Sequence, residues 1–194
     1  MDELIRNNIE RTINARLNDE AFQSFFQLLE QRTFERRESL IHAGQYCHHI
    51  FFINKGIAYS FLEDEKAEHH TIQFAFEGYW IADLSSFFSG HPAIFNIESL
   101  EPTTVWQLSR NNFERACHDI AQFERFFRIL IQRAYVNMQH RLAKTFSDSA
   151  EERYLTLLKQ HPDILQRVPQ YLVASYLGIK PQSLSRIRKN LQKK

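Results

Sequence analysis

The chain is poor in the residues that mark several protein classes. Its 194 residues include two cysteines, five glycines and five prolines, and Cys47 stands 70 positions before Cys117. This spacing fits no metal-binding or redox motif, so buried, reduced thiols are expected. The low glycine and proline content argues against a disordered chain. No apolar run is long enough to span a bilayer, and the first residues lack the apolar core of a signal peptide. We therefore expect a cytoplasmic protein that makes no membrane contact.

Acidic residues are missing from the last part of the chain. Residues 166–194 hold seven of the 24 Lys and Arg residues and no Asp or Glu, so the other 17 basic residues accompany all 23 acidic ones. The net charge of +1 therefore combines a tail of +7 with a body of −6. A surface polarised in this way favours a polyanionic partner. The alternative interpretation is a solvated helix pair whose basic residues serve solubility.

Two short helices are predicted in this basic tail. Apolar residues recur at helical spacing over residues 170–177 and again after Pro181. Gly178 supplies a residue that takes positive φ and ends the first helix, and Pro181 suits the first turn of the second. Ala174 is small enough to let the two helices approach closely. This pattern resembles the helix-turn-helix unit of DNA-binding regulators.

The middle of the chain has the pattern of short strands. Between residues 33 and 108, apolar runs such as 50–53 and 70–76 alternate with glycine turns. Regularly spaced short strands of this kind predict a small antiparallel barrel or jelly roll. The polar run Glu63–Lys66 is the predicted tip of an exposed hairpin.

Helical periodicity flanks the strands on both sides. Helices are predicted over residues 3–17 and about 19–31, the second capped by Asn18 or Asp19. A longer helix is predicted from about 119 to 146, which corresponds to about 42 Å. Its apolar stripe exceeds what a small domain would cover, so the predicted partner is the same helix of a second subunit in a short parallel coiled coil. Packing entirely against its own barrel is the alternative. The predicted homodimer contacts are Phe123, Phe127, Leu130, Ala134, Met138 and Leu142.

The predicted domain boundaries follow from these periods. We expect a sensor domain at residues 1–118, the long dimerisation helix at 119–146 and a DNA-binding domain at 147–194. Ser149 and Glu152 have the spacing of a capping box at the start of the next helix. The polar run 147–149 is therefore the predicted hinge.

The order of these elements resembles the Crp/Fnr family of bacterial transcription regulators. The local matches are Ile50–Gly56, Phe76–Ile81 and Gly178–Ile187, and the resemblance covers about residues 19–189. It implies an α+β fold with an N-terminal antiparallel, jelly-roll-like β-roll and flanking helices, a long dimerisation helix and a small helix-turn-helix domain. It also implies a homodimeric DNA-binding regulator that is not an enzyme, with double-stranded DNA and RNA polymerase as partners.

The expected effector pocket departs from the family pattern. Members that bind cyclic AMP carry a Gly-Glu pair, whose glutamate accepts from the ribose hydroxyl, and a later arginine that forks onto the cyclic phosphate. Here the first pair falls at Ala82–Asp83 and the arginine position falls near Phe95. No Lys or Arg occurs from Leu84 to Leu100, so a buried phosphate would lack its cation. We expect cyclic nucleotides to bind poorly or not at all, and we assign no cofactor. The residues of this degenerate pocket are Trp80, Ala82, Asp83, Leu84, Phe95 and Asn96.

The second helix of the tail is the predicted recognition helix. Gln182 suits adenine and Arg186 suits guanine, so both are expected to contact base edges. The basic residues should mostly contact phosphates and set the register, and the serines should contact either. The predicted DNA contacts are Lys180, Gln182, Ser183, Ser185, Arg186, Arg188 and Lys189.

Two other functions compete with this interpretation. Cupin enzymes have a similar barrel and bind metal through histidines, and the barrel region holds six histidines. Neighbours on a strand point to opposite faces, however, so His48–His49 and His69–His70 each offer one inward ligand, and the cupin His-x-His spacing is absent. We therefore assign no metal ligand and no catalytic residue. A signalling adaptor that has lost DNA binding is the third possibility, against which the +7 tail argues.

Overall fold

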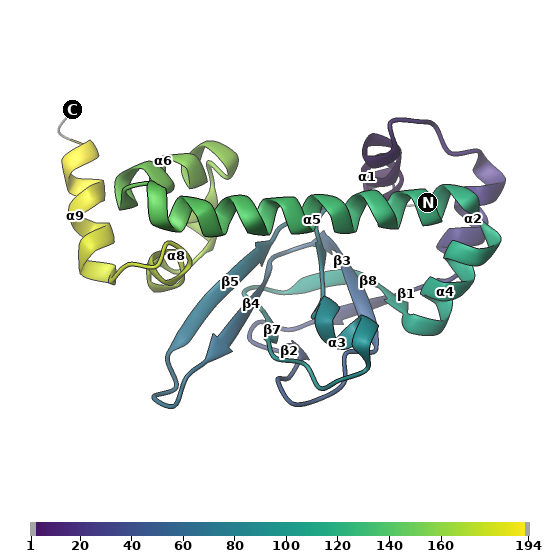
Figure 1. Cartoon of the computed structure of the whole chain (residues 1–194), viewed down its shortest axis with the longest axis horizontal. Coiled ribbons are helices and arrows are strands. Elements are labelled where there is room, and N and C mark those ends of the chain that lie inside the picture. The colour runs from purple at the N-terminus through teal and green to yellow at the C-terminus, as the bar shows by residue number, and fades with distance from the viewer. Residues whose placement is uncertain (1–2, 193–194) are drawn as a thin grey trace. The chain divides into compact units, whose positions relative to one another are not determined.

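The computed structural model describes residues 3–192, which fold as two compact units (Figure 1). The first unit comprises the residues up to Ser60 together with Phe74–Tyr135. The second comprises Phe61–Gln73 and the residues from Val136 onward. Each unit is therefore assembled from segments that are far apart in the sequence.

The strands form two four-stranded sheets in the part of the chain that the structure describes. Their orders are β1-β8-β3-β6 and β2-β7-β4-β5. The pairs β1·β8, β3·β8, β3·β6 and β2·β7 are antiparallel, which confirms the predicted antiparallel roll. The strand bounds are β1 (Leu29–Phe34), β2 (Ser39–Ile41), β3 (His49–Lys55), β4 (Ala58–Glu63), β5 (His69–Ala75), β6 (Trp80–Ile81), β7 (Asn96–Ser99) and β8 (Thr103–Ser109).

The turn between β3 and β4 requires glycine. Gly56 has a φ of +95°, a conformation that side chains with a Cβ rarely adopt. A Cβ at this position would lie 2.7 Å from the carbonyl oxygen of Pro102 and 2.6 Å from Thr103 Oγ1. The glycine therefore lets the turn approach the start of β8 closely.

The helices begin where the sequence supplies capping side chains. Asn18 caps α2 by accepting a hydrogen bond from the N–H of Ala21 at 2.6 Å, which confirms one of the two predicted caps. The predicted extension of this helix to about residue 31 is wrong, because Leu29 already pairs with Leu108 as part of β1. The helix bounds are α1 (Glu3–Ile13), α2 (Asp19–Phe26), α3 (Leu84–Ser89), α4 (Arg110–Asp119), α5 (Ala121–Ser147), α6 (Ala150–Gln160), α7 (Ile164–Arg167), α8 (Gln170–Tyr176) and α9 (Pro181–Leu191).

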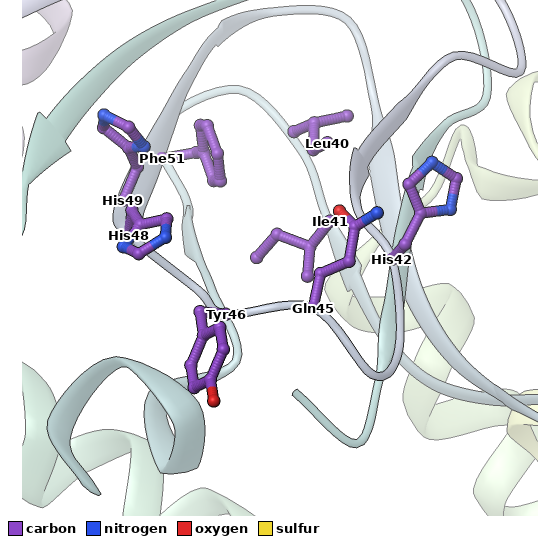
Figure 2. A pocket seen from close by; sticks show the side chains of 8 residues that line it. All are labelled: Leu40, Ile41, His42, Gln45, Tyr46, His48, His49 and Phe51. Carbon is purple, nitrogen blue, oxygen red and sulfur yellow. The ribbon is translucent and has the colours of Figure 1, made fainter. Parts of the chain in front are cut away.

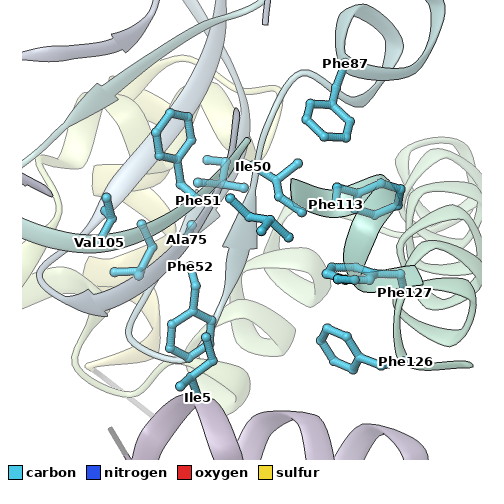
Figure 3. Packing of buried hydrophobic residues seen from close by; sticks show 14 of the residues in the cluster. Ile5, Ile50, Phe51, Phe52, Ala75, Phe87, Val105, Phe113, Phe126 and Phe127 are labelled. Atoms are coloured by element: carbon cyan, nitrogen blue, oxygen red, sulfur yellow. The ribbon is translucent and has the colours of Figure 1, made fainter. Parts of the chain in front are cut away.

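Aromatic rings join the first turns of α5 to the core of the first unit (Figure 3). The Phe123 ring stacks on Phe25 with centroids 3.9 Å apart, and the Phe127 ring lies 4.7 Å from Phe113. Phe126 lies 4.9 Å from Phe127, and all three α5 rings are buried. This end of the long helix is therefore part of the core rather than an appendage to it.

The second unit has a smaller core of its own. The capping box at the start of α6 is present as predicted. Ser149 Oγ accepts from the N–H of Glu152, and the Glu152 carboxylate accepts from the N–H of Ser149 at 2.8 Å. The residues buried in the helices that follow and at their C-caps are Tyr154, Leu157, Ile164, Val168, Leu172, Val173, Ala174, Leu177 and Leu184.

Both cysteines are free thiols that are withdrawn from solvent. Cys47 is buried and Cys117 is half-buried. Burial raises the pKa of each thiol to about 11. The reactive thiolate form is therefore scarce at neutral pH.

The burial of the first turns of α5 predicts that two Phe→Ala substitutions in this helix reduce the stability by different amounts. Phe127→Ala removes a ring that is 2% exposed and should destabilise the protein by about 3–5 kcal/mol. Phe146→Ala removes the same atoms from a ring that is 84% exposed and should change the stability by less than about 0.5 kcal/mol. Urea unfolding followed by circular dichroism measures both. Equal losses would contradict the assignment of Phe127 to the core.

Candidate nucleic-acid interface and effector pocket

Helices α8 and α9 pack on one another across a short turn. Gly178 takes a φ of +68° at this turn, and its N–H donates to the Ser175 carbonyl at 2.9 Å. Ala174 and Leu184 are fully buried between the helices, as their spacing predicted. The turn thus fixes the direction in which α9 leaves α8.

The polar side of α9 faces solvent. Leu184 is the buried residue of this helix, and six of the seven predicted contact residues are exposed. Arg188 differs because it is half-buried beside Tyr154. Burial raises the pKa of the Tyr154 hydroxyl, and the charge and hydrogen bond of Arg188 offset part of the rise. Arg188 therefore joins α9 to α6, a contact that the sequence pattern did not indicate. The exposed six are Lys180, Gln182, Ser183, Ser185, Arg186 and Lys189.

The N-terminus of α9 carries no side-chain cap. Lys180 is the N-cap residue, and Pro181 stands at the first helical position as predicted. The backbone dipoles give this end of the helix a partial positive charge, to which Lys180 adds a full one. Anions are therefore favoured at this end of the helix.

Arg153 links the segment before α6 to the turn before α9. One guanidinium nitrogen donates to the carbonyl of Asp148 at 2.6 Å, and the other donates to the carbonyl of Leu177 at 3.1 Å. The polar run 147–149 is thus braced against the end of α8. Sequence reasoning missed Arg153 because one arginine in an amphipathic helix resembles any solvated charge.

Two residues of the expected degenerate effector pocket form hydrogen bonds with separate parts of the first unit. Trp80 donates from Nε1 to Asn8 Oδ1 at 3.0 Å and lies 5.8 Å from Phe126, so its ring joins α1 to the core. The Asn96 side chain accepts from the N–H of Ala43 at 3.0 Å, beside β2. Ala82, Leu84 and Phe95 are half-buried.

Asp83 is the buried polar group of this region. It is fully buried, and it caps α3 by accepting from the N–H of Ser86 at 2.9 Å. Its second oxygen accepts from the N–H groups of Ile94 and Phe95 at 2.8 and 3.0 Å. Helix α3 was not predicted, and Asp83 was predicted to line the degenerate effector pocket. In the structure its carboxylate joins the first turn of α3 to the backbone of residues 94–95, between β6 and β7.

Two surface cavities lie elsewhere in the first unit. One of about 150 Å³ is lined by residues of β2, β3 and the loop between them. Figure 2 shows His48 and His49 on one side of it and His42 on the other. The second, of about 520 Å³, lies at the α1–α2 loop beside Arg6 and Asp19. Neither cavity is lined by any of the six expected effector-pocket residues.

The described residues contain neither a metal-like cluster nor a membrane-spanning helix. Over residues 3–192, no three His, Cys, Asp or Glu side chains converge as a metal ion would require. Over the same residues, every helix is too short or too polar to cross a membrane.

The exposed apolar stripe of α5 contains fewer residues than the predicted dimer contact. Phe123 and Phe127 are buried in their own unit, so they are not available to a partner subunit. Their predicted place in the dimer contact is therefore wrong. Met138 and Leu142 are 59% and 61% exposed. The free apolar stripe therefore lies in the second half of the helix.

The position of Asp83 predicts a specific weakness. Asp83→Asn leaves one acceptor oxygen and places an N–H₂ group against backbone donors, so it should destabilise the protein by about 1–3 kcal/mol. It should also speed amide exchange at Ile94 and Phe95, because these N–H groups lose their acceptor. Urea unfolding and hydrogen exchange measure the two effects. Asp119→Asn, at an exposed aspartate, is the matched control, and equal behaviour of the two variants would contradict the structural role of Asp83.

Comparisons with known proteins agree with this architecture. Residues 31–119 match the family described as "Cyclic nucleotide-binding domain". The structure of FixK2 from Bradyrhizobium japonicum is 16% identical, has a TM-score of 0.74 and covers 85% of each chain. The c-di-GMP-responsive global regulator CLP of Xanthomonas campestris is 10% identical, has a TM-score of 0.72 and covers 91% of this chain and 92% of its own.

A third similar structure is the catabolite activator protein of Thermus thermophilus. It is 15% identical, has a TM-score of 0.60 and covers 94% of this chain and 87% of its own. No curated protein matches the chain by sequence. Residues 31–119 thus resemble a cyclic nucleotide-binding domain, and the fold of the chain is similar to the folds of these three proteins.

Proposed function

We propose that this chain is a DNA-binding transcription regulator of the Crp/Fnr type, and that α9 is its recognition helix. The observation that carries the proposal is the exposed face of α9, where Gln182 and Arg186 lie opposite the buried Leu184. The helix stands in a tail that has seven basic and no acidic residues. A major groove admits an α-helix, and its phosphates favour such a tail.

The proposal gives the residues of α9 different roles. Gln182 and Arg186 have the bidentate chemistry that suits adenine and guanine edges. Lys180 stands at the positive end of the helix and suits a phosphate, as does Lys189 in the last turn. Arg188 is shared with Tyr154, so we assign it first to holding α9 against α6 and second to phosphate contact.

A homodimer completes the proposed function. Recognition helices of this class usually work in pairs, with half-sites about 34 Å apart. The second half of α5 exposes an apolar stripe that would be costly to leave in water, and the same stripe on a second copy would cover it. The exposed residues of this stripe are Ala134, Met138 and Leu142, and Leu130, which is half-buried, precedes them.

We further propose that cyclic nucleotides do not control this regulator in the usual way. Asp83 already accepts three backbone hydrogen bonds, so its carboxylate is committed to the loop before β7. The expected position of the phosphate-binding arginine falls near Phe95, and residues 84–100 contain no Lys or Arg. A buried phosphate would thus meet a fixed carboxylate and no cation from this segment.

The decisive experiment is selection of bound DNA from a random pool, followed by binding assays on the selected sequence at two salt concentrations. A regulator should enrich a two-fold symmetric site, and its log affinity should fall with log salt by about 0.9 per phosphate neutralised. A chain that enriches no sequence and binds no DNA at low salt would be an adaptor rather than a regulator.

Replacing Arg186 should relax the sequence preference. Arg186→Ala should cost about 1–3 kcal/mol on the selected site and little on sites that differ at one base pair. Lys180→Ala should instead weaken binding to all DNA sequences alike and reduce the slope of log affinity against log salt by about one. Fluorescence anisotropy on a panel of single-base variants distinguishes the two effects. A uniform loss in Arg186→Ala would mean that this residue contacts phosphate.

A charge on the free stripe of α5 should separate the subunits. Met138→Glu places a carboxylate in the proposed apolar contact and should raise the dimer dissociation constant by at least about tenfold, because unpaired charges are costly to bury. Asn137→Glu adds the same charge to the adjacent exposed position and serves as the control. Analytical ultracentrifugation over a concentration series measures both. A dimer that is unaffected by Met138→Glu would place the subunit contact elsewhere.

A further inference from the structure

The loop between β4 and β5 is a closed hairpin. Asp64 Oδ1 accepts hydrogen bonds from the N–H groups of Lys66 and Glu68 at 2.9 and 3.0 Å, and Oδ2 accepts one from His70 Nε2 at 2.9 Å. The bond from His70, followed by those from the two N–H groups, lowers the pKa of Asp64 to about 2. The carboxylate therefore stays ionised at neutral pH and keeps the turn closed. This confirms the predicted hairpin tip.

Helix α8 holds the edge of this hairpin through one hydroxyl group. Ser175 Oγ donates to the His69 carbonyl at 2.6 Å and accepts from the N–H of Thr71 at 2.8 Å. Strand β5 stands last in its sheet, so these backbone groups lie on its free edge. Free edges normally expose unpaired donors and acceptors. Ser175 satisfies two of them in the way that a neighbouring strand would.

The end of α5 contributes a second contact to the same place. The Arg141 guanidinium donates to the Ile72 carbonyl and lies over the Tyr176 ring, 4.9 Å from its centroid. Tyr176 follows Ser175 on α8, so two adjacent residues of α8 face the hairpin region. The hairpin, α8 and the end of α5 belong to the same compact unit.

One group opposes the docked arrangement. The hydroxyl of Thr71 is buried and has no hydrogen-bond partner among residues 3–192. A buried hydroxyl without a partner is unfavourable relative to a solvated one. The docking of the hairpin is therefore a balance of favourable and unfavourable contacts, which a change of one side chain can shift in either direction.

Docking leaves the reading side of α9 uncovered. Gln182 and Arg186 are exposed in the docked arrangement, as are Lys180 and Lys189. The contact therefore does not block DNA. It holds α8, from which the turn at Gly178 fixes the direction of α9.

We propose that Ser175 and Arg141 are positioning residues for DNA binding, which seat α8 on the β4–β5 hairpin and so set the orientation of the recognition helix. The strands of the hairpin continue into the β-roll, so the roll has a link to the DNA-binding helices besides α5. The consequence for DNA rests on the proposed function, whereas the docking itself is measured without DNA.

Hydrogen exchange on the full-length chain tests the docking. Ser175→Ala removes both hydrogen bonds, so exchange at the Thr71 amide and across α8 should accelerate roughly tenfold. Arg141→Ala should accelerate exchange over the same residues and keeps the test valid if one variant folds poorly. Thr71→Val removes the unpaired hydroxyl and should slow exchange there. Ser24→Ala, at an exposed serine of α2, is the control and should leave both segments unchanged.

Binding to the selected DNA tests the positioning role. The Ser175→Ala and Arg141→Ala variants should bind the selected DNA roughly three- to tenfold more weakly. In these variants α9 is correctly oriented in a smaller fraction of the molecules. Thr71→Val should bind at least as tightly as the original chain.

Each result decides a separate point. Unchanged exchange in both Ser175→Ala and Arg141→Ala would overturn the docking. Faster exchange with unchanged or tighter DNA binding would overturn the positioning role, since the hairpin would then be a spectator or a restraint. If the original chain binds no DNA, the proposed function and the positioning role both fail, and the exchange data still decide whether the hairpin is docked.

Discussion

The arrangement of this protein depends on the aromatic anchoring of α5. Phe123, Phe126 and Phe127 are buried in the first unit, whereas the helix beyond Tyr135 is largely exposed. A ring buried among other rings stabilises by burial of apolar area and by favourable edge and stacked geometry. One helix of 27 residues thus has one end fixed in a core, while Met138 and Leu142 nearer its other end are exposed. That division gives a long helix both a structural and a proposed assembly role.

Two aspartate side chains stabilise turns by accepting hydrogen bonds from backbone N–H groups. Asp83 accepts three N–H groups around α3, and Asp64 closes the β4–β5 turn. Charge-assisted hydrogen bonds of this kind are strong, and a carboxylate engaged in three of them has little capacity left for a ligand. Ser175 also stabilises the backbone, because its one hydroxyl pairs with a donor and an acceptor on a strand edge. The roll is therefore held closed by local polar contacts as well as by its apolar core.

The parts of the fold that the sequence predicted are those set by local chemistry. The cap at Asn18, the box at Ser149, the turn at Gly178 and the start of α9 at Pro181 follow from preferences of single residues. The missed parts depend on tertiary contacts. Helix α2 ends before the predicted residue because β1 pairs with β8. Helix α3 forms where Asp83 accepts hydrogen bonds from the backbone of residues 94–95. Phe123 and Phe127 share a stripe with Met138, and periodicity alone cannot tell which part of a stripe its own domain will cover. The same limit applied to Arg153 and Ser175, whose partners lie far away in the sequence.

The burial of the two thiols has a practical consequence. Cys47 and Cys117 hold their protons at neutral pH, since burial raises the pKa of each to about 11. Thiolates are the species that alkylating reagents and peroxide attack, so the native side chains should remain unmodified while a cysteine introduced on the outer face of α9 reacts. The unaltered chain is therefore a ready background for attaching one fluorophore or spin label to α9.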